Sequence, residues 1–446
     1  MSQVATIFAL SSAPGRAGVA VIRISGPAAG TVLDILAAPR PQPRSARMRY
    51  LRHQDSGEVL DQALVLWFPG PQSFTGEDVA ELHVHGGRAV VQAVLRAIGD
   101  VPGCRLAEPG EFARRAFENG KLDLTMAEGL ADLIDAETEA QRKQALRQAG
   151  GALANLYDGW RNSLVEALAL VEAAIDFSDE GDVGTATFAE AVRVVRDLES
   201  AIRRHLSDGR RGEILREGFN VVLAGPPNVG KSSLLNALAR REAAIVSDEA
   251  GTTRDVIEVR LDLEGLPIVV GDTAGIREAS GAVEREGIRR TLARTREADL
   301  VLWLMDASAP DPNLPPELAE LADRTLWVLN KIDLRSDVAL SVVSDNAIAI
   351  SALTGQGIED LTRRLADIAR DRIAPGEHPG LTQERHRRNL EECCNALAAF
   401  LQGNPGQVEL RAEDLRLAAN ALGRITGRVD PEQVLDGIFG RFCIGK

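Results

Sequence analysis

Residues 225–232 are the segment that most restricts how this chain can fold. They read GPPNVGKS and match G-x-x-x-x-G-K-[ST], between the apolar run FNVVLA and the helix-forming run SSLLNALA. In that context the glycines let backbone N–H groups close around a phosphate at a helix N-terminus, where the helix dipole favours an anion. We expect Lys231 to reach the β and γ phosphates and Ser232 to hold Mg²⁺. The segment predicts a nucleotide-binding α/β module.

Three further motifs follow in the order typical of a GTPase. DTAG at 272–275 supplies an aspartate that can reach Mg²⁺ through water and a glycine N–H for a γ-phosphate. In NKID at 330–333, Asp333 can accept two N–H bonds from guanine, which adenine cannot supply. SAL at 351–353 predicts the last base-binding loop. Each motif alone could be a turn, but together they predict a GTP site containing Asn228, Val229, Gly230, Lys231, Ser232, Ser233, Asp272, Thr273, Ala274, Gly275, Asn330, Lys331, Asp333, Ser351 and Ala352.

The residue after the D-x-x-G motif indicates how hydrolysis is catalysed. Many GTPases have a glutamine there to orient water, but this chain has Ile276, which can neither orient nor deprotonate water. Asn228 and loop carbonyls could instead hold a monovalent cation, whose charge would replace that of an arginine finger. Thr253, in GTTRD at 251–255, would complete the Mg²⁺ shell. Glu284 is a candidate to orient water, although a solvated helix carboxylate is the simpler interpretation from the residues alone.

The rest of the chain divides into regions of different pattern. Residues 5–99 alternate short β-rich runs with turns, include a basic, proline-rich loop at 39–43, and predict an α+β region dominated by strands. Residues 122–216 and 384–446 have helical periodicity and few prolines. Between them, strands alternate with helices, which predicts βαβ units and a mainly parallel sheet. The two helical stretches could form one domain with the α/β module inserted in a loop.

Composition excludes several classes of protein. The chain has 446 residues, of which 45% are hydrophobic and 26% charged, so it is neither disordered nor low in complexity. Its net charge of −14 argues against binding nucleic acid by bulk charge. Its four scattered cysteines predict no disulfide framework and no metal site. Without a signal-peptide pattern or a run of 18 uncharged apolar residues, the sequence predicts a soluble, cytoplasmic protein.

Together these motifs resemble those of one family, the bacterial tRNA-modification GTPases called MnmE or TrmE. The resemblance spans the whole chain and rests on PNVGKSSLLNAL, GTTRD, DTAGIRE, NKID and the C-terminal FCIGK. It implies a multidomain fold with an inserted Ras-like α/β P-loop G domain at 218–377. It also implies an N-terminal α+β folate-binding and dimerisation domain at 1–120 and a discontinuous α-helical domain at 121–217 and 378–446.

The resemblance also implies roles for single residues of the G domain. It adds Ser247, Thr252 and Thr253 to the GTP site. It places K⁺ on Asn228, Ser247, Glu249 and Thr252, and Mg²⁺ on Ser232 and Thr253. The family's water-orienting glutamate aligns with Glu284, which reverses the simpler interpretation given above, and Arg277 is a second catalytic candidate in the same segment.

In the N-terminal module the family's one-carbon tetrahydrofolate site maps onto Arg23, Glu81, Lys121 and the terminal Lys446. A carboxylate can pair with the amidine-like edge of a pterin, and a glutamyl tail requires cations. The position of Lys446 implies that the C-terminal tail folds back onto this site. Cys443 invites a nucleophile interpretation, but no base lies near it in sequence, and a packed or supporting thiol is favoured.

Three residues of one predicted strand allow another interpretation. Glu81, His83 and His85 share a strand face at a spacing that a metal could use. The family has no metal there, and we interpret both histidines as surface or site-lining residues.

The resemblance implies a K⁺-dependent GTPase that acts as a homodimer, with transient contacts between its G domains. With a flavin-dependent partner similar to MnmG (GidA), it would install the 5-carboxymethylaminomethyl group on the wobble uridine of certain tRNAs, and the folate would supply the methylene carbon. Because this chain is acidic, we expect the partner to supply most of the basic surface for tRNA.

Two rival functions belong to other classes. A ribosome-assembly GTPase shares the G-domain motifs but usually adds an RNA-binding domain after the G domain, where this chain is helical. A stand-alone folate-dependent aminomethyl transferase is disfavoured by the intact G-domain motifs.

Overall fold

The computed structural model of the chain contains two compact units. The first comprises Met1–Ala131, Gln148–Arg196 and Asn395–Lys446, and the second comprises Asp132–Arg147 and Asp197–Cys394. A compact unit can hold more than one domain, so the predicted domain boundaries stay a prediction. The structure describes residues 5–176, 181–208, 210–241, 243–245, 258–272, 295–311, 313–334, 347–373, 380–404, 407–429, 431–440, 442 and 444–445, without the side chains of 181–184, 433 and 434.

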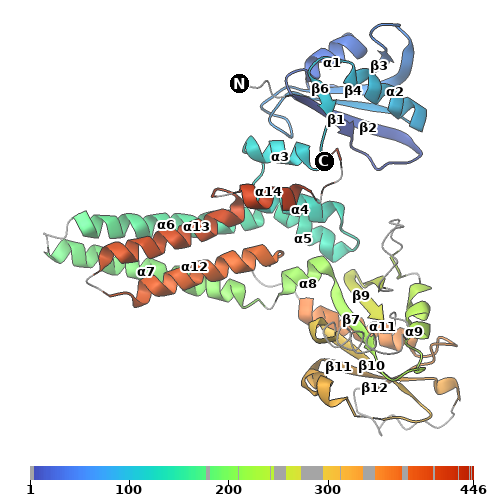
Figure 1. Cartoon of the computed structure of the whole chain (residues 1–446), viewed down its shortest axis with the longest axis vertical. Helices are drawn as coiled ribbons and strands as arrows, with labels where there is room; N and C mark the ends of the chain where they lie inside the picture. The colour runs from blue at the N-terminus through green and yellow to red at the C-terminus, as the bar shows by residue number, and fades with distance from the viewer. Residues whose placement is uncertain are drawn as a thin grey trace, which may run out of the picture. The chain divides into compact units, whose positions relative to one another are not determined.

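The first unit contains a six-stranded sheet in the order β3-β4-β5-β2-β1-β6 (Figure 1). Neighbouring strands are antiparallel except for β1 and β6. The strands are β1 (Thr6–Leu10), β2 (Ala17–Ser25), β3 (Arg47–Arg52), β4 (Val59–Phe68), β5 (Val79–Gly86) and β6 (Cys104–Leu106).

Two helices cover one face of this sheet, α1 (Ala29–Leu36) and α2 (Arg88–Gly99). Because side chains alternate along a strand, Val65 of β4 and Leu82 of β5 point to this covered face, where both are fully buried. Residues at the alternate positions point to the opposite face. That opposite face carries Arg23 and Glu81, which is where the sequence predicts the folate site.

The helical part of the first unit joins segments that are far apart in sequence. Its elements include α3 (Glu111–Glu118), α6 (Ala152–Asp176), α13 (Val408–Thr426) and α14 (Glu432–Phe439), while α4 (Leu124–Ile134), α7 (Gly181–Leu206) and α12 (Glu384–Gln402) belong partly to each unit. Helices α6 and α13 lie side by side in Figure 1. Each buries one stripe, which includes Leu164 and Val171 on α6 and Leu415 and Leu422 on α13.

The second unit is built on a sheet in the order β12-β11-β10-β7-β9-β8. All neighbouring pairs are parallel except β8 with β9, which confirms the predicted mainly parallel sheet. Its strands are β7 (Phe219–Ala224), β8 (Glu258–Leu263), β9 (Leu266–Asp272), β10 (Leu300–Asp306), β11 (Thr325–Asn330) and β12 (Ala347–Ala349).

Helical segments pack on both faces of the second sheet. Two of them, α9 (Lys231–Ala239) and α11 (Ile358–Ile373), bury Leu235 and Leu365 in one core. The 3₁₀ helix η1 (Pro316–Arg324) buries Leu318 against Trp303 on the other face. In an open parallel sheet with helices on both faces, ligands bind at the carboxyl ends of the strands. The predicted GTP-binding motifs follow the ends of β7, β9, β11 and β12.

None of the helices that the structure describes is long and apolar enough to cross a bilayer.

Candidate functional site

The loop that joins β7 to α9 has the backbone of a phosphate cradle. Gly225 and Gly230 have φ angles of 143° and 101°, in the region that side chains disfavour. A Cβ on Gly225 would lie 2.4 Å from the Leu304 carbonyl oxygen, and one on Gly230 would lie 2.3 Å from Asn330 Nδ2. Glycine is therefore required at both positions, and the loop curves tightly before the first turn of α9.

Lys231, the first residue of α9, is folded back over this loop. Its Nζ donates to the carbonyl oxygens of Gly225 and Pro226, both at 2.9 Å. Burial lowers the pKa of Lys231, and Asp272 partly offsets that effect. The ammonium thus lies over the phosphate cradle, where an anionic ligand would stabilise its charge.

Ser232 and Asp272 meet beside the lysine. The hydroxyl of Ser232 donates to Asp272 Oδ2 at 2.9 Å, and Asp272 is only 5% exposed. Mg²⁺ prefers oxygen ligands, and a hydroxyl and a carboxylate from these two motifs are the protein groups that hold it in P-loop NTPases. The residues present therefore fit a Mg²⁺ ion bound together with nucleotide phosphates.

Asn330 links the phosphate loop to the loop that follows β12, which the sequence predicts to bind the base. It is 2% exposed, its Nδ2 donates to the Val229 carbonyl oxygen at 2.8 Å, and its Oδ1 accepts the Ala352 N–H at 3.0 Å. Sequence reasoning placed this asparagine in the GTP site without identifying these two bonds. Asn330 holds the loop after β12 against the phosphate loop.

Asp333, the aspartate of the NKID motif, is also fixed by its neighbours. Ser351 Oγ donates to Asp333 Oδ1 at 2.5 Å, so the residues of two predicted motifs are in contact. Lys331 Nζ lies 2.8 Å from Asp306 Oδ2, and this hydrogen bond is the main reason why the pKa of Asp306 falls to about 2. The carboxylate of Asp306 therefore stays ionised and anchors Lys331 beside the nucleotide loop.

Asn228 occupies an exposed position on the phosphate loop. It lines a cavity of about 220 Å³ together with residues that include Asp306 and Lys331. Its φ angle is 59°, a left-handed conformation that asparagine tolerates better than most residues. Among the residues that the structure describes, its side chain makes no hydrogen bond. Its amide oxygen is therefore available to a cation.

The N-terminal sheet brings two of the predicted folate residues together. Arg23 on β2 is directly opposite Glu81 on β5, and Arg23 Nε lies 3.2 Å from Glu81 Oε1. The Arg23 guanidinium also lies 5.4 Å from the ring centroid of Phe74 and 5.8 Å from that of Phe112. Both charged side chains remain about one fifth exposed, at 23% and 20%. This is a partly exposed ion pair beside two aromatic rings, and its exposed polar atoms are accessible to a ligand.

Lys121 and the C-terminal tail approach the same region. The side-chain Cε of Lys121 lies 3.3 Å from where a Cβ on Gly76 would be, two residues beyond Phe74. Gly445 accepts a hydrogen bond from Ser11 Oγ at 2.8 Å, just beyond β1, where Ala9 pairs with Arg23. The tail therefore folds back onto this sheet, as its sequence position implied, although Lys446 lies outside the described residues.

The two histidines of β5 have separate carboxylate partners. His83 Nε2 lies 3.4 Å from Glu81 Oε2, whereas His85 Nδ1 lies 2.7 Å from Asp61 Oδ1. Burial opposes ionisation of Asp61, but hydrogen bonds from His85 and the backbone outweigh it and lower the pKa of Asp61. Where the structure describes the chain, no group of three potential metal ligands occurs. His83 lines the Arg23 site, and His85 is a surface residue.

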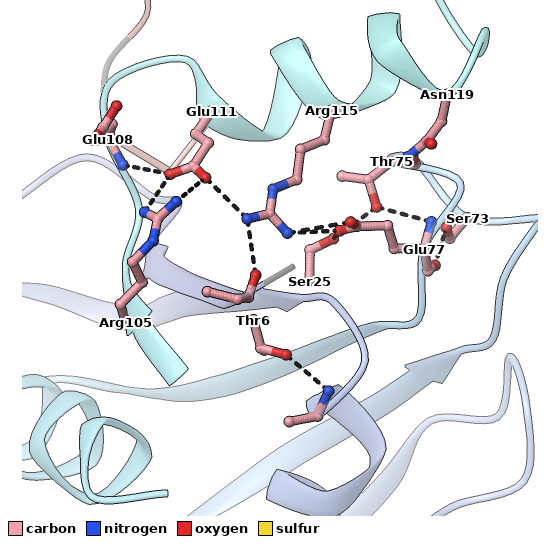
Figure 2. A network of polar contacts seen from close by, with 12 residues as sticks. Thr6, Ser25, Ser73, Thr75, Glu77, Arg105, Glu108, Glu111, Arg115 and Asn119 are labelled. Carbon is pink, nitrogen blue, oxygen red and sulfur yellow. Dashed lines mark hydrogen bonds and ion pairs between the residues drawn. The ribbon is translucent and has the colours of Figure 1, made fainter. Parts of the chain in front are cut away.

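A buried polar network that sequence reasoning missed holds the walls of the Arg23 site (Figure 2). Arg115 of α3 is 7% exposed; its Nη1 lies 3.1 Å from Glu77 Oε2 and its Nη2 lies 3.0 Å from Glu111 Oε1. Ser25 Oγ donates to Glu77 Oε2 at 2.6 Å. These bonds tie α3, which carries Phe112, to the loop that carries Phe74, and so fix both rings around Arg23.

Comparison with known proteins decides the family. A family model described as the MnmE helical domain matches residues 124–443, and one described as the GTP-binding protein TrmE N-terminus matches residues 6–121. The chain belongs to the MnmE family of tRNA modification GTPases. The predicted family and fold class are both confirmed.

Curated relatives match this MnmE-family chain from end to end. The tRNA modification GTPase MnmE of Parvibaculum lavamentivorans is 56% identical over 445 residues, which cover 99% of this chain and 100% of the relative. Those of Maricaulis maris and Paramagnetospirillum magneticum are each 54% identical, over 442 and 445 residues and 99% of both chains. The identity therefore extends over both units and is not confined to the widespread P-loop module.

Several residues that the sequence assigned to the MnmE-type sites lie outside the described residues, and their roles stay predictions. They are Ser247, Glu249, Thr252, Thr253, Thr273, Ala274, Gly275, Arg277, Glu284, Cys443 and Lys446.

Proposed function

We propose that this chain is a K⁺-dependent GTPase that acts in the cytoplasm with a flavin-dependent partner of the MnmG type. Together they would install the 5-carboxymethylaminomethyl group on the wobble uridine of certain tRNAs. The observation that supports this proposal is the presence, in one MnmE-family chain, of two formed sites. One is the Ser232–Asp272 pair over a phosphate loop, and the other is the Arg23–Glu81 pair between two aromatic rings.

The G site supports GTP binding and hydrolysis by electrostatic positioning. Lys231 would leave the carbonyl oxygens of its own loop and bind the phosphates, where Ser232, Asp272 and Thr253 would hold Mg²⁺. Bound Mg²⁺ would neutralise charge on the phosphate oxygens. Glu284 would orient the attacking water, with Arg277 as a second candidate. GTP hydrolysis would drive association and separation of the two G domains in a homodimer whose N-terminal domains form the stable contact.

K⁺ would complete the phosphate site. The side chain of Asn228 is exposed and makes no hydrogen bond among the described residues, so it fits a cation ligand, and Ser247, Glu249 and Thr252 would supply further oxygens. The ion would provide the positive charge that an arginine finger supplies in other GTPases.

Replacing K⁺ by Na⁺ at constant ionic strength should slow GTP hydrolysis at least about tenfold, because a smaller ion fits the same oxygens poorly. Asn228→Ala should abolish the difference between the two salts. Asn236→Ala, which removes an exposed asparagine of α9 outside the phosphate loop, should preserve the difference between the two salts. Turnover measured at saturating GTP decides the point, and equal rates of the wild-type chain in both salts would refute the cation role.

The Arg23 site would bind a one-carbon-substituted tetrahydrofolate. Its residues fit this ligand, because Glu81 is a carboxylate that can accept from the amidine-like edge of a pterin, and the exposed ring of Phe74 offers a face for stacking. Lys121 and Lys446 would bind the anionic glutamyl tail. When bound, the folate would supply the methylene carbon of the modification.

Arg23→Ala should weaken binding of formyl-tetrahydrofolate about tenfold to a hundredfold. The substitution removes a cation from the site, and it also removes the contacts through which Arg23 positions Glu81 and Phe74. Arg96→Ala, on the exposed side of α2, should leave the affinity unchanged. Isothermal titration of the full-length variants makes the comparison. If Arg23→Ala binds formyl-tetrahydrofolate with wild-type affinity, the folate site does not lie on this face of the sheet.

Mass spectrometry of tRNA nucleosides from a strain that lacks this chain tests the complete proposal. We expect loss of the wobble modification and its recovery when the wild-type gene is returned. Intact modification together with a defect in ribosomal subunits would instead support the rival function of a ribosome-assembly GTPase.

A further inference from the structure

Positive charge is concentrated at one edge of the N-terminal sheet. Strand β3 is the first strand in the sheet order, and β4 is its only partner among the described strands. The strand and the loop before it carry arginines at positions 40, 44, 47, 49 and 52, in a chain whose net charge is −14. This segment is therefore strongly basic in an acidic protein.

Four of these arginines have no carboxylate partner in the part of the chain that the structure describes. Arg40 pairs with Asp34. Of the others, Arg44 donates to the Gln72 carbonyl oxygen, Arg49 to that of Pro39 at 2.9 Å, and Arg52 to that of Gly57 at 3.1 Å. Arg47 is exposed, and its side chain makes no hydrogen bond with a described residue. Bonds to carbonyl oxygens leave the guanidinium charge uncompensated.

Exposed apolar side chains alternate with these arginines along the strand. Tyr50 is 55% exposed and Met48 is 52% exposed, whereas Leu51 is fully buried in the core. The Arg52 guanidinium lies 5.9 Å from the Tyr50 ring centroid. The edge thus presents cations together with an exposed aromatic ring, beside which the Arg52 guanidinium lies.

We propose that Arg44, Arg47, Arg49 and Arg52, with Tyr50, form a basic edge that binds the backbone of a folded RNA. A guanidinium can donate two hydrogen bonds to one phosphate, and an exposed aromatic ring can stack on an unpaired base. Both features recur in proteins that bind single-stranded regions of RNA. The inference rests on the proposed function for the identity of that RNA, which is the tRNA substrate.

A second copy of this chain is a poorer occupant of the same edge. Pairing of two β3 strands would bring their arginines together, and charges on an edge strand discourage pairing. A protein partner would need an acidic surface, but the substrate of the family already has a polyanionic backbone. Charge complementarity therefore favours RNA.

The basic edge is compatible with the overall negative charge of the chain. Four phosphate contacts give a plot of the logarithm of the binding constant against the logarithm of the salt concentration with a slope of about −3 to −4. This slope is much shallower than that of proteins that bind nucleic acid by bulk charge. Binding by the isolated chain should thus be weak and measurable at low salt. The edge would orient the tRNA, while the partner enzyme supplies most of the affinity.

Fluorescence anisotropy with a labelled tRNA transcript and the full-length chain, over about 50 to 200 mM salt, tests the proposal. Arg47→Gln/Arg49→Gln should reduce the magnitude of the salt slope by about 2, because it removes two phosphate contacts. Arg47→Lys/Arg49→Lys should retain the slope. Arg88→Gln/Arg96→Gln, which removes two exposed arginines from α2 in the same module, should also leave it unchanged.

The same variants separate RNA binding from misfolding and from self-association. Unchanged GTP hydrolysis in Arg47→Gln/Arg49→Gln shows that the chain is folded, so a reduced slope with normal hydrolysis supports the basic edge. An unchanged slope, or no tRNA binding by the wild-type chain, would overturn the proposal. So would a shift in the monomer–dimer equilibrium in sedimentation with no effect on RNA, which would assign the edge to a second copy. The nucleoside analysis of the deletion strain is independent, so the proposed function can stand if this inference fails.

Discussion

Asp333→Asn should change the base preference of the G site from guanine to xanthine. Guanine presents two N–H donors to this position, and the aspartate carboxylate can accept both. An asparagine would place its NH₂ group against one of those donors, whereas xanthine has an oxygen at that position and would accept from the amide. Sites that read a base through such paired hydrogen bonds discriminate by about 10⁴-fold, so GTP affinity should fall by about that factor and xanthosine triphosphate should bind instead.

Titration of both nucleotides into the full-length protein gives this result directly. Asp360→Asn is a matched control, because Asp360 is an exposed aspartate near the start of α11 whose carboxylate pairs with Arg363, three residues further along the helix. Loss of affinity for both nucleotides in Asp333→Asn would contradict base reading. It would mean that Asp333 mainly holds the loop through its 2.5 Å contact with Ser351 Oγ, and Ser351→Ala should then cause the same loss.

The sequence was a good guide to the G site because each motif is local and follows a strand. Parallel strands end at the same edge of a sheet, so the spacing of the motifs sufficed to place Ser232 beside Asp272 and Ser351 beside Asp333. The bonds of Asn330 were not predictable in the same way. They depend on the distance between loops that precede α9 and follow β12, which is set by the packing of the whole sheet.

The polar network around the Arg23 site could not be predicted from local sequence patterns alone. Arg115 and Glu77 are separated by 38 positions, and a helix that reads EFARRAFE gives no sign that its second arginine is buried. Charged residues are mostly exposed, so sequence reasoning treats such an arginine as solvated. One useful signal was available, because Glu111 and Arg115 at i and i+4 lie on one helix face, next to Phe112. Within residues 5–99, which the sequence predicts to be dominated by strands and turns, helix α1 was not predicted, because its eight residues barely cover two turns of a helical period.

The G site, the Arg23 site and the basic edge differ in how the charge of their cationic side chains is compensated, although the chain as a whole is acidic. The G site holds its cationic side chain against loop carbonyl oxygens, and the Arg23 site pairs its arginine with Glu81. By contrast, Arg44, Arg47, Arg49 and Arg52 lie close together along β3 and its preceding loop, and none of them pairs with a carboxylate among the described residues. If the basic edge binds the tRNA as proposed, a substrate with a polyanionic backbone and the small anionic ligands would bind at different places on the chain.

Lys231→Met should abolish most nucleotide binding while changing the stability of the free protein little. In the structure the lysine makes two charge-assisted bonds to loop carbonyl oxygens, but these are offset by the burial that lowers its pKa. With nucleotide, the same ammonium would face phosphate charge, where each bond contributes about 1.5–3 kcal/mol. Affinity for GDP and GTP should therefore fall at least about a hundredfold.

Thermal unfolding with and without GDP and Mg²⁺ separates these two effects of Lys231→Met. At a GDP concentration about a thousandfold above its Kd, the ligand stabilises the wild-type protein by about 4 kcal/mol, and a large loss of affinity removes most of that gain. Lys143→Met, at a lysine whose side chain is 64% exposed, should keep the full GDP-induced shift. A full shift in Lys231→Met as well would mean that the ammonium stays on its loop carbonyl oxygens in the bound state. The phosphates would then be held by the backbone N–H groups of the loop, and the lysine would be a structural cap of the phosphate cradle.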